Sequence, residues 1–235
     1  MIISIHQSEH LSYLGFWKKY ISSDVFVLLD KAQYQKNYYC NRNRIVLNGK
    51  EHWLTVPVYN APSETSMTDI KICYKENWQR KYLETLRHAY SKSLSFNILY
   101  PRLEKIINHK FELLLHLNCN LLDLVIDWFG LHRNIVVQSA MKLPDNKTGS
   151  ELLYQIVDAF GDNEVEQVYL SGPSGREYLD MKLFEDHDIP VIFSYPPAPT
   201  SSYVQLSDDF IPNMSILDYM FNQPRDLECL KSHLS

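Results

Sequence analysis

Cysteine and glycine are scarce, with 4 Cys and 7 Gly in a chain of 235 residues. The cysteines are far apart in the sequence and match no zinc or CxxC spacing, so we expect free thiols in a reducing cytosol. No apolar run approaches the roughly 18 residues of a membrane span. The N-terminus shows neither the basic segment nor the apolar core of a signal peptide. The sequence therefore predicts a cytoplasmic protein with no membrane span.

Excess positive charge is also missing, since the formal net charge is −5. A nucleic-acid-binding protein is usually basic, so we expect no nucleic-acid partner. The sequence has no HExxH, GxSxG or Walker pattern, which disfavours a zinc protease, an α/β-hydrolase and a P-loop enzyme. We expect no protein-bound metal. With 45% hydrophobic and 22% charged residues, the composition is that of an ordinary globular protein.

What is present is an alternation of short apolar runs and helical patterns. The pattern predicts buried strands over residues 2–5 and 24–30, with a helix over 13–21 between them, which is a βαβ unit. The later part alternates again: strands over 134–138, 165–170 and 189–193, and helices over 148–160, 174–187, 214–222 and 225–232. We therefore expect an α/β fold with a parallel-rich sheet built from both ends of the chain and flanked by helices. Such a sheet occurs in nucleotidyltransferase-like and Rossmann-like folds, which are the two fold types that we consider for it.

The middle of the chain has a different pattern. Asn48 and Gly49 lie between two β-rich runs, 43–47 and 51–56, which is a strong hairpin signal. Residues 69–73 suggest another short strand. The spacing then predicts a helix over 77–90 and a long helical stretch over 102–129, with Pro101 in its first turn, a break at 118–120 and a stop at Gly130. We expect one domain over residues 1–235, with 77–130 as a helical cap or subdomain.

Three polar segments are the candidate sites. The first begins with His6 and Gln7, directly after the first strand, and continues to Tyr13. In open α/β sheets, ligands bind beyond the carboxyl ends of the strands. Histidine can move a proton near neutral pH, and glutamine can hold a ligand without charge. Capping of the next helix is the alternative role for this pair.

The second segment follows the second strand and would open at the same edge. Its arginines suit phosphates or carboxylates, and its amides suit sugars or nucleobases. Arg42 and Arg44 alternate as one face of a strand would, although a solvated loop is the alternative. The candidate binding residues are Asp30, Gln33, Tyr34, Asn37, Asn41, Arg42 and Arg44, with Lys36 as a catalytic candidate beside His6.

The third segment runs from Tyr169 to Leu179. A strand, a glycine-containing loop and a helix form an anion site when the free N–H groups of the helix point at the ligand. The same pattern is common in βα turns without a ligand. The candidate residues here are Ser171, Gly172, Ser174, Gly175 and Tyr178.

These segments resemble the motifs of the WbqC-like protein family over nearly the whole chain. The residues that carry the resemblance are His6-Gln7 through Leu14-Gly-Phe16, Asp24-Val-Phe-Val-Leu-Leu-Asp30 through Arg44, Trp53-Leu-Thr-Val-Pro-Val58, and Tyr169-Leu-Ser-Gly-Pro-Ser-Gly175. Phe210-Ile-Pro through Asp218 is also similar. Ser8 and Ser12 depart from the family, which usually has prolines there, so the loop after the first strand is less constrained in this chain.

The resemblance implies a role in the biosynthesis of surface polysaccharide such as O-antigen. It implies transfer of a glycine-like aminoacyl group, or another acyl group, to a nucleotide-linked sugar. Such a transfer needs an activated carboxyl group, so ATP with Mg²⁺ or an acyl carrier is the expected energy source, although the sequence alone names no cofactor. A weak analogy to HxGH nucleotidyltransferases would place His6 at an α-phosphate, but the second histidine of that motif is missing.

The sequence leaves two other hypotheses about function open. The same residues would serve a non-catalytic protein that binds a nucleotide sugar or glycan during assembly. They would also serve a sugar-modifying enzyme that needs no ATP. The sequence determines neither the sugar, the transferred group nor the oligomeric state.

Overall fold

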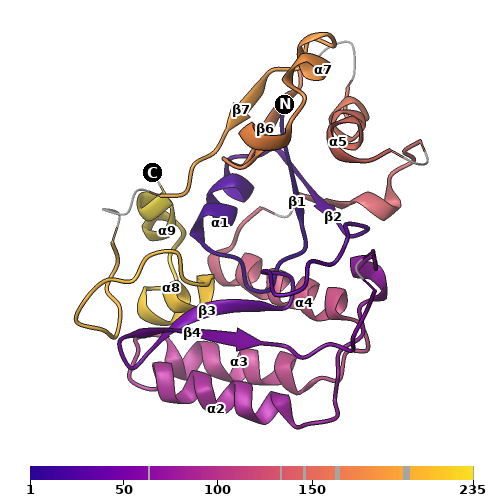
Figure 1. The fold of residues 1–235 in the computed structure, drawn as a ribbon. Helices are drawn as coiled ribbons and strands as arrows, with labels where there is room; N and C mark the ends of the chain where they lie inside the picture. The colour runs from indigo at the N-terminus through magenta and orange to yellow at the C-terminus, as the bar shows by residue number, and fades with distance from the viewer. Residues whose placement is uncertain (63, 133, 145–146, 162–164, 198–201, 235) are drawn as a thin grey trace. The chain divides into compact units, whose positions relative to one another are not determined.

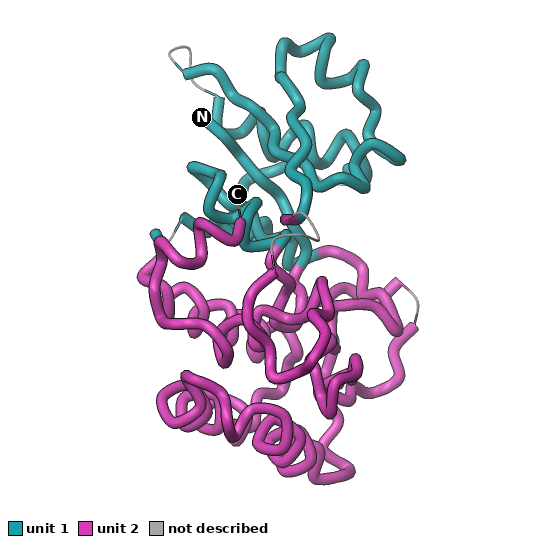
Figure 2. The backbone as a smooth tube through the Cα atoms, turned by 90° about the vertical axis from the view of Figure 1, so that its left-hand side faces the viewer, with its two compact units in different colours: residues 1–7, 15–31, 132–196 teal, residues 8–14, 32–131, 197–235 magenta. Residues whose placement is uncertain are grey.

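The computed structural model describes residues 1–62, 64–132, 134–144, 147–161, 165–197 and 202–234. It separates into two compact units (Figure 2). Unit 1 comprises residues 1–7, 15–31 and 132–196, and unit 2 comprises residues 8–14, 32–131 and 197–235. Unit 2 therefore contains the helices expected over 77–130 together with the hairpin, the segment after the first strand and the C-terminal part of the chain.

Unit 1 is built on a parallel sheet of five strands, which confirms the predicted α/β class (Figure 1). The strands are β1 (Ile2–Gln7), β2 (Val25–Leu29), β5 (Ile135–Val137), β6 (Val168–Ser171) and β7 (Val191–Phe193), in the spatial order β5-β2-β1-β6-β7. Counted along the chain, this order is 3-2-1-4-5, the start of the Rossmann order. All four strand pairs are parallel.

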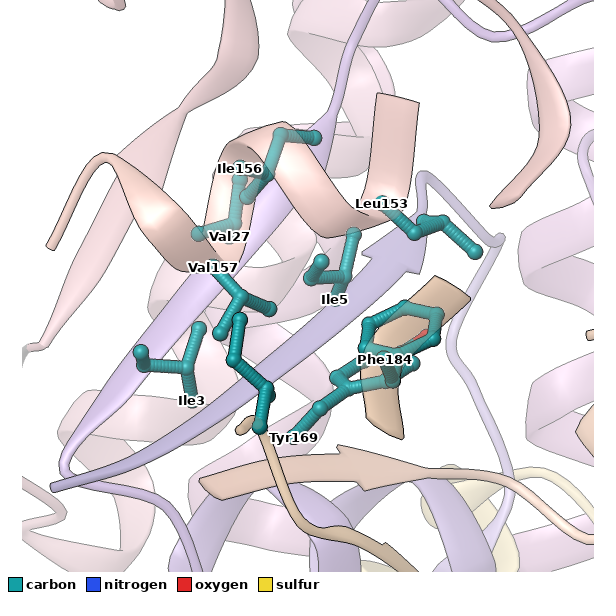
Figure 3. Close-up of a cluster of buried hydrophobic side chains, with 9 residues drawn as sticks. Ile3, Ile5, Val27, Leu153, Ile156, Val157, Tyr169 and Phe184 are labelled. Carbon is teal, nitrogen blue, oxygen red and sulfur yellow. The ribbon is translucent and has the colours of Figure 1, made fainter. Parts of the chain in front are cut away.

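Helices cover the sheet because its strands are apolar on both faces. Alternate residues of β1, Ile3 and Ile5, pack against α5 (Gly149–Asp158) through Ile156 and its neighbours, and Phe184 of α7 (Met181–Glu185) completes this cluster (Figure 3). On β2, Phe26 contacts aromatic rings of α1 (Leu14–Ile21) instead. The apolar core of unit 1 is thus built on the three central strands β2, β1 and β6.

Unit 2 contains the predicted hairpin, formed by β3 (Arg42–Leu47) and β4 (Lys50–Thr55). Asn48 and Gly49 both have positive φ, 52° and 69°, as the tight turn requires. The helices of unit 2 are α2 (Trp78–Tyr90), α3 (Phe96–Asn108), α4 (Leu114–Phe129), α8 (Ile216–Asn222) and α9 (Leu227–Leu234). β3 packs against α2 and α8.

Two helix ends agree with the local sequence patterns, and two other predictions about helices are wrong. Asn77 caps α2 by accepting from the Arg80 N–H, and Gly130 ends α4 with φ 62°. The predicted break at 118–120 is wrong, because the helices part at 109–113 and Asn118 lies inside α4. Pro101 also lies inside α3, five residues after its start, rather than in the first turn.

Two further sequence predictions are corrected. Residues 69–73 form no strand: the 3-10 turn Met67–Asp69 is followed by isolated bridges at Lys71 and Ile72. The helix expected over 174–187 is two short helices, α6 (Gly175–Tyr178) and α7, because Leu179 is extended and Asp180 caps α7. In the described part of the chain, none of the helices has the length and apolar character needed to cross a membrane.

Candidate functional site

The predicted site residues divide between the two units, and each group lies in its own structural setting. In unit 1, His6 and Gln7 end β1, Asp30 follows β2, and Ser171 ends β6. Because all the strands are parallel, these residues occur at the same edge of the sheet, the carboxyl edge. The sequence pattern thus predicted the shared edge of these strand ends, but the rest of the second segment, from residue 32 on, belongs to unit 2 rather than to this sheet.

The separation of β1 from β6 marks the topological switch point of the sheet. β1 pairs with β2 as far as Gln7, but it pairs with β6 only from Ile2 to Ser4. From β1, the chain adds β2 and β5 on one side and then β6 and β7 on the other. Ligands of such sheets bind at the point where this order reverses. His6 and Gln7 lie on one side of this point, and the loop from Ser171 lies on the other.

His6 is a neutral imidazole in this setting. Burial, assisted by the positive charge of Lys19, lowers its pKa to about 3. Its Nδ1 lies 3.0 Å from the Gln7 carbonyl oxygen. A carbonyl can only accept, so Nδ1 carries the proton and Nε2 carries the lone pair. The edge of the Phe16 ring fixes the imidazole further, with centroids 4.9 Å apart. At a pKa this low, His6 is suited to accept a hydrogen bond rather than to take up a proton near neutral pH, which corrects the expectation from the sequence.

Lys19 is a residue that the sequence analysis missed. It is only 4% exposed, and its Nζ donates to the Ile5 carbonyl at 2.7 Å. Carbonyls of a strand point alternately to its two neighbours, and the Met1 carbonyl accepts from Val168 of β6. The Ile5 carbonyl therefore points to the β6 side, beyond the last β1–β6 pair. Lys19 brings an ammonium group to the switch point.

The signal for Lys19 was weak because the helical spacing of Leu14, Trp17 and Ile21 suggested a different buried face. In the structure, the buried residues of α1 are Phe16, Trp17, Lys19 and Tyr20. A lysine is rarely buried without a specific role, so burial is the observation that singles it out. Sequence spacing alone could not provide it.

The loop from Ser171 to Tyr178 combines a packed and an open glycine. A Cβ on Gly175 would lie 2.2 Å from the Ser171 Oγ, whereas one on Gly172 would meet nothing within 4 Å. Ser171 is fully buried, while Ser174 and Tyr178 are exposed. α6 has only four residues, so the helix-terminus argument for an anion site here loses its physical basis. The open backbone at Gly172 is what remains for close approach of a ligand.

Arg176 in this loop and Tyr195 beside it were not selected from the sequence. The Arg176 guanidinium lies 4.4 Å from the Phe193 ring centroid, and its Nε donates to the Tyr195 hydroxyl at 2.8 Å.

Asp30, which was selected from the sequence, has a structural role. It is 5% exposed, and its Oδ1 accepts from the Ser139 N–H at 2.9 Å. This bond joins the end of β2 to the segment after β5, which is a structural task.

In unit 2, several selected residues hold backbone together. Asn41 is buried and donates from Nδ2 to the Val56 carbonyl at 2.8 Å. Tyr34 is buried, with its N–H bonded to the Thr65 carbonyl. Tyr13 forms a bridge with Ser215, and burial raises its phenol pKa to about 12. Gln33 bridges to Ser66. The Asn41 bond is made by its side chain and explains that amide without a ligand, whereas the contacts of Tyr34, Tyr13 and Gln33 are made by their backbone.

The other selected residues of unit 2 lie toward solvent. Lys36 and Asn37 are exposed, and Asn37 has a left-handed backbone with φ 62°. Arg42 and Arg44 occupy one face of β3, as their alternation predicted, and the Asn37 carbonyl accepts from Arg42. Unit 2 thus presents its cationic candidates on the hairpin.

His10 belongs to the interior of unit 2. It is fully buried, its Nδ1 lies 3.1 Å from the Asn118 Oδ1, and its Nε2 lies 2.9 Å from the Tyr82 hydroxyl. Burial lowers its pKa to about 4. Asn118 also donates to the Cys40 carbonyl, which explains why an asparagine is accommodated within α4. Among the described residues, no group of three or more His, Cys, Asp or Glu side chains could hold a metal ion.

Comparison with known proteins gives a consistent result. An uncharacterized protein of Mycobacterium tuberculosis is 29% identical over 222 residues, which cover 94% of this chain and 93% of the relative. No solved structure matches. The model of the WbqC-like protein family matches residues 7–228, which include the motifs of both units. The chain therefore belongs to the WbqC-like protein family.

Proposed function

We propose that the protein is a cytoplasmic enzyme of surface-polysaccharide (O-antigen) biosynthesis that transfers an aminoacyl or acyl group to a nucleotide-linked sugar. The observation that carries this proposal is the switch point of unit 1. There, a 3-2-1-4-5 sheet has His6 and Gln7 on one side and the open Gly172 backbone on the other. This is the place where sheets of this order bind nucleotides.

The residues at this edge suit acyl transfer. The neutral imidazole of His6 accepts a hydrogen bond from the attacking amine or hydroxyl of the sugar while the new bond forms to the acyl carbon, and the proton of the attacking group passes to water. The bond from that carbon to its activating group breaks, and the activating group leaves with the electron pair. Gln7 orients the sugar by hydrogen bonds, and the positive charge of Lys19 favours a ligand with negative charge.

A panel of ligands tests the binding step. We would measure thermal unfolding with ATP and Mg²⁺, free amino acids, acyl-CoA, and UDP-, dTDP- and GDP-sugars. A ligand at 100 times its Kd adds about 2.7 kcal/mol. That stabilisation corresponds to a rise in Tm of roughly 5–10 °C for a chain of this size. Shifts with both ATP and a nucleotide sugar support the ATP-driven transfer. A shift with a nucleotide sugar alone favours binding without ATP, and no shift with any ligand contradicts the proposal.

A matched pair of histidine variants tests the chemical step. His6→Gln removes the imidazole, and we expect turnover of the sugar found in the panel to fall about tenfold or more. His187→Gln is the control, because His187 is exposed in the same unit and its Nδ1 also contacts a backbone carbonyl. Product formation would be followed by mass spectrometry. Equal turnover by the two variants would exclude a role for His6 in the transfer.

A further inference from the structure

The hairpin of unit 2 presents aromatic and guanidinium groups together. In the β3–β4 register, Arg44 is directly opposite Trp53, and Arg42 is two residues away on the same face. The alternate residue Asn43 points inward and is buried. We call Tyr38, Tyr39, Arg42, Arg44 and Trp53 the hairpin platform. Its composition follows from strand alternation, which places both arginines beside one indole ring.

The rings of the platform lie close together, and those of Tyr38 and Trp53 are exposed. The Arg42 guanidinium lies 4.3 Å from the Trp53 ring centroid and that of Arg44 lies 5.7 Å away. Tyr39 lies 5.8 Å from Trp53, and Tyr38 lies 5.0 Å from Tyr39. Trp53 is nevertheless 39% exposed, whereas the other three tryptophans are buried. An indole fixed by its neighbours but open to water is a surface on which a ligand ring can stack.

The two arginines differ in how their charge is balanced. Arg44 pairs with Glu51 at 3.0 Å and donates to the Asn213 carbonyl at 3.2 Å. Arg42 donates to the uncharged Asn37 carbonyl and, in the residues the structure describes, forms no ion pair. Its positive charge is therefore fixed beside Trp53 without a neutralising carboxylate. Guanidinium groups in this position bind phosphate strongly.

We infer that the hairpin platform is a second binding site, which takes a phosphorylated sugar. The sugar ring stacks on the open side of Trp53, and its phosphate binds Arg42. The negative face of the indole suits the weakly positive C–H groups of a pyranose ring. Arg42 and Tyr39 already contact Trp53, and the 39% of its surface that stays exposed is what a ligand can cover. This inference goes beyond the proposed transfer, since it concerns binding in the other unit.

Quenching of tryptophan fluorescence by acrylamide provides a direct test with the full-length protein. Trp53 is the exposed tryptophan of the four in the chain, so it should give most of the quenching. We expect glucose 1-phosphate to protect it in a saturable manner, more strongly than glucose, inorganic phosphate or uridine monophosphate. Trp53→Phe should remove the quenchable signal and so confirm its source.

Calorimetric titration with glucose 1-phosphate then identifies the contacts. We expect Trp53→Ala and Arg42→Gln each to weaken binding about tenfold or more. Trp53→Tyr, which keeps an aromatic face, should retain most of the affinity. Tyr59→Ala is the control, because Tyr59 is 47% exposed and has Lys75 over its ring at 5.8 Å but lies outside the platform. Circular dichroism would verify that each variant is folded.

Four results would overturn the inference: no binding of glucose 1-phosphate, equal binding by inorganic phosphate, equal binding by Trp53→Ala and the parent, or tighter binding of uridine monophosphate, which would reject a sugar as the ligand. His6→Gln should leave this binding unchanged, because His6 belongs to unit 1. A failure of the platform and a failure of the proposed transfer are therefore separable.

Discussion

The two units place their polar residues differently. In unit 1 the cluster between the sheet and α5 is apolar, and polar candidates collect at the strand ends. In unit 2 the interior itself holds polar groups, including the carboxylate of Asp218 and the imidazole of His10. A polar residue in a strand–loop–helix pattern of unit 1 is therefore a better indicator of a site. In unit 2 the same residue type often fastens one segment to another.

Asp218 should give the largest effect on stability. Its carboxylate is fully buried and accepts from Tyr90 at 2.6 Å and from Tyr203 and Gln205 at 2.8 Å. Asp218→Ala leaves three buried donors without their acceptor, so we expect a loss of about 3–5 kcal/mol. Urea unfolding would measure it, with exposed Asp209→Ala as the control. A loss similar to the control would show that the interior of unit 2 does not depend on this network.

His10 should make unit 2 sensitive to acid. Its pKa is lowered to about 4 in the folded protein, and the ordinary value is 6.5. Below pH 6.5 the unfolded chain binds a proton that the folded protein excludes, so stability falls as the pH drops toward 4. We expect His10 to contribute a loss of roughly 3 kcal/mol over this window. Urea unfolding from pH 7 to 4 should show a smaller loss in His10→Gln, and parallel curves would contradict the prediction.

The glycines of the unit 1 loop should give the smallest and most selective effects. Gly175→Ala crowds the Ser171 hydroxyl, and we expect a loss of about 1–3 kcal/mol. Gly172→Ala meets open space and should change stability by less than about 0.5 kcal/mol. It should nevertheless weaken nucleotide-sugar binding, because a methyl group would stand where a ligand approaches. Unfolding and ligand-induced Tm shifts, measured together, separate the two roles. Unchanged binding in Gly172→Ala would place the ligand elsewhere.

The candidate site in unit 1 could be predicted from local patterns because parallel strands share one carboxyl edge. When a polar pair follows one parallel strand and a glycine loop follows another, both must lie at the same edge. His6 and Ser171 do so. Unit 2 offered no such rule. Arg42 and Asn41 are adjacent in the sequence, yet Arg42 faces the platform and Asn41 holds the backbone of Val56.

The sequence by itself determined the α/β class, the hairpin turn at Asn48–Gly49 and the end of α4 at Gly130, because each depends on neighbouring residues. Only the tertiary structure decided the burial of Lys19, the position of Asn118 inside α4 and the departure of β1 from β6 after Ser4. Each of these depends on a partner outside the local element. The Ile5 carbonyl is 14 residues from Lys19, and β6 lies more than 160 residues after β1. Long-range packing and hydrogen bonding outweigh local propensity at such positions, so no local pattern could reveal them.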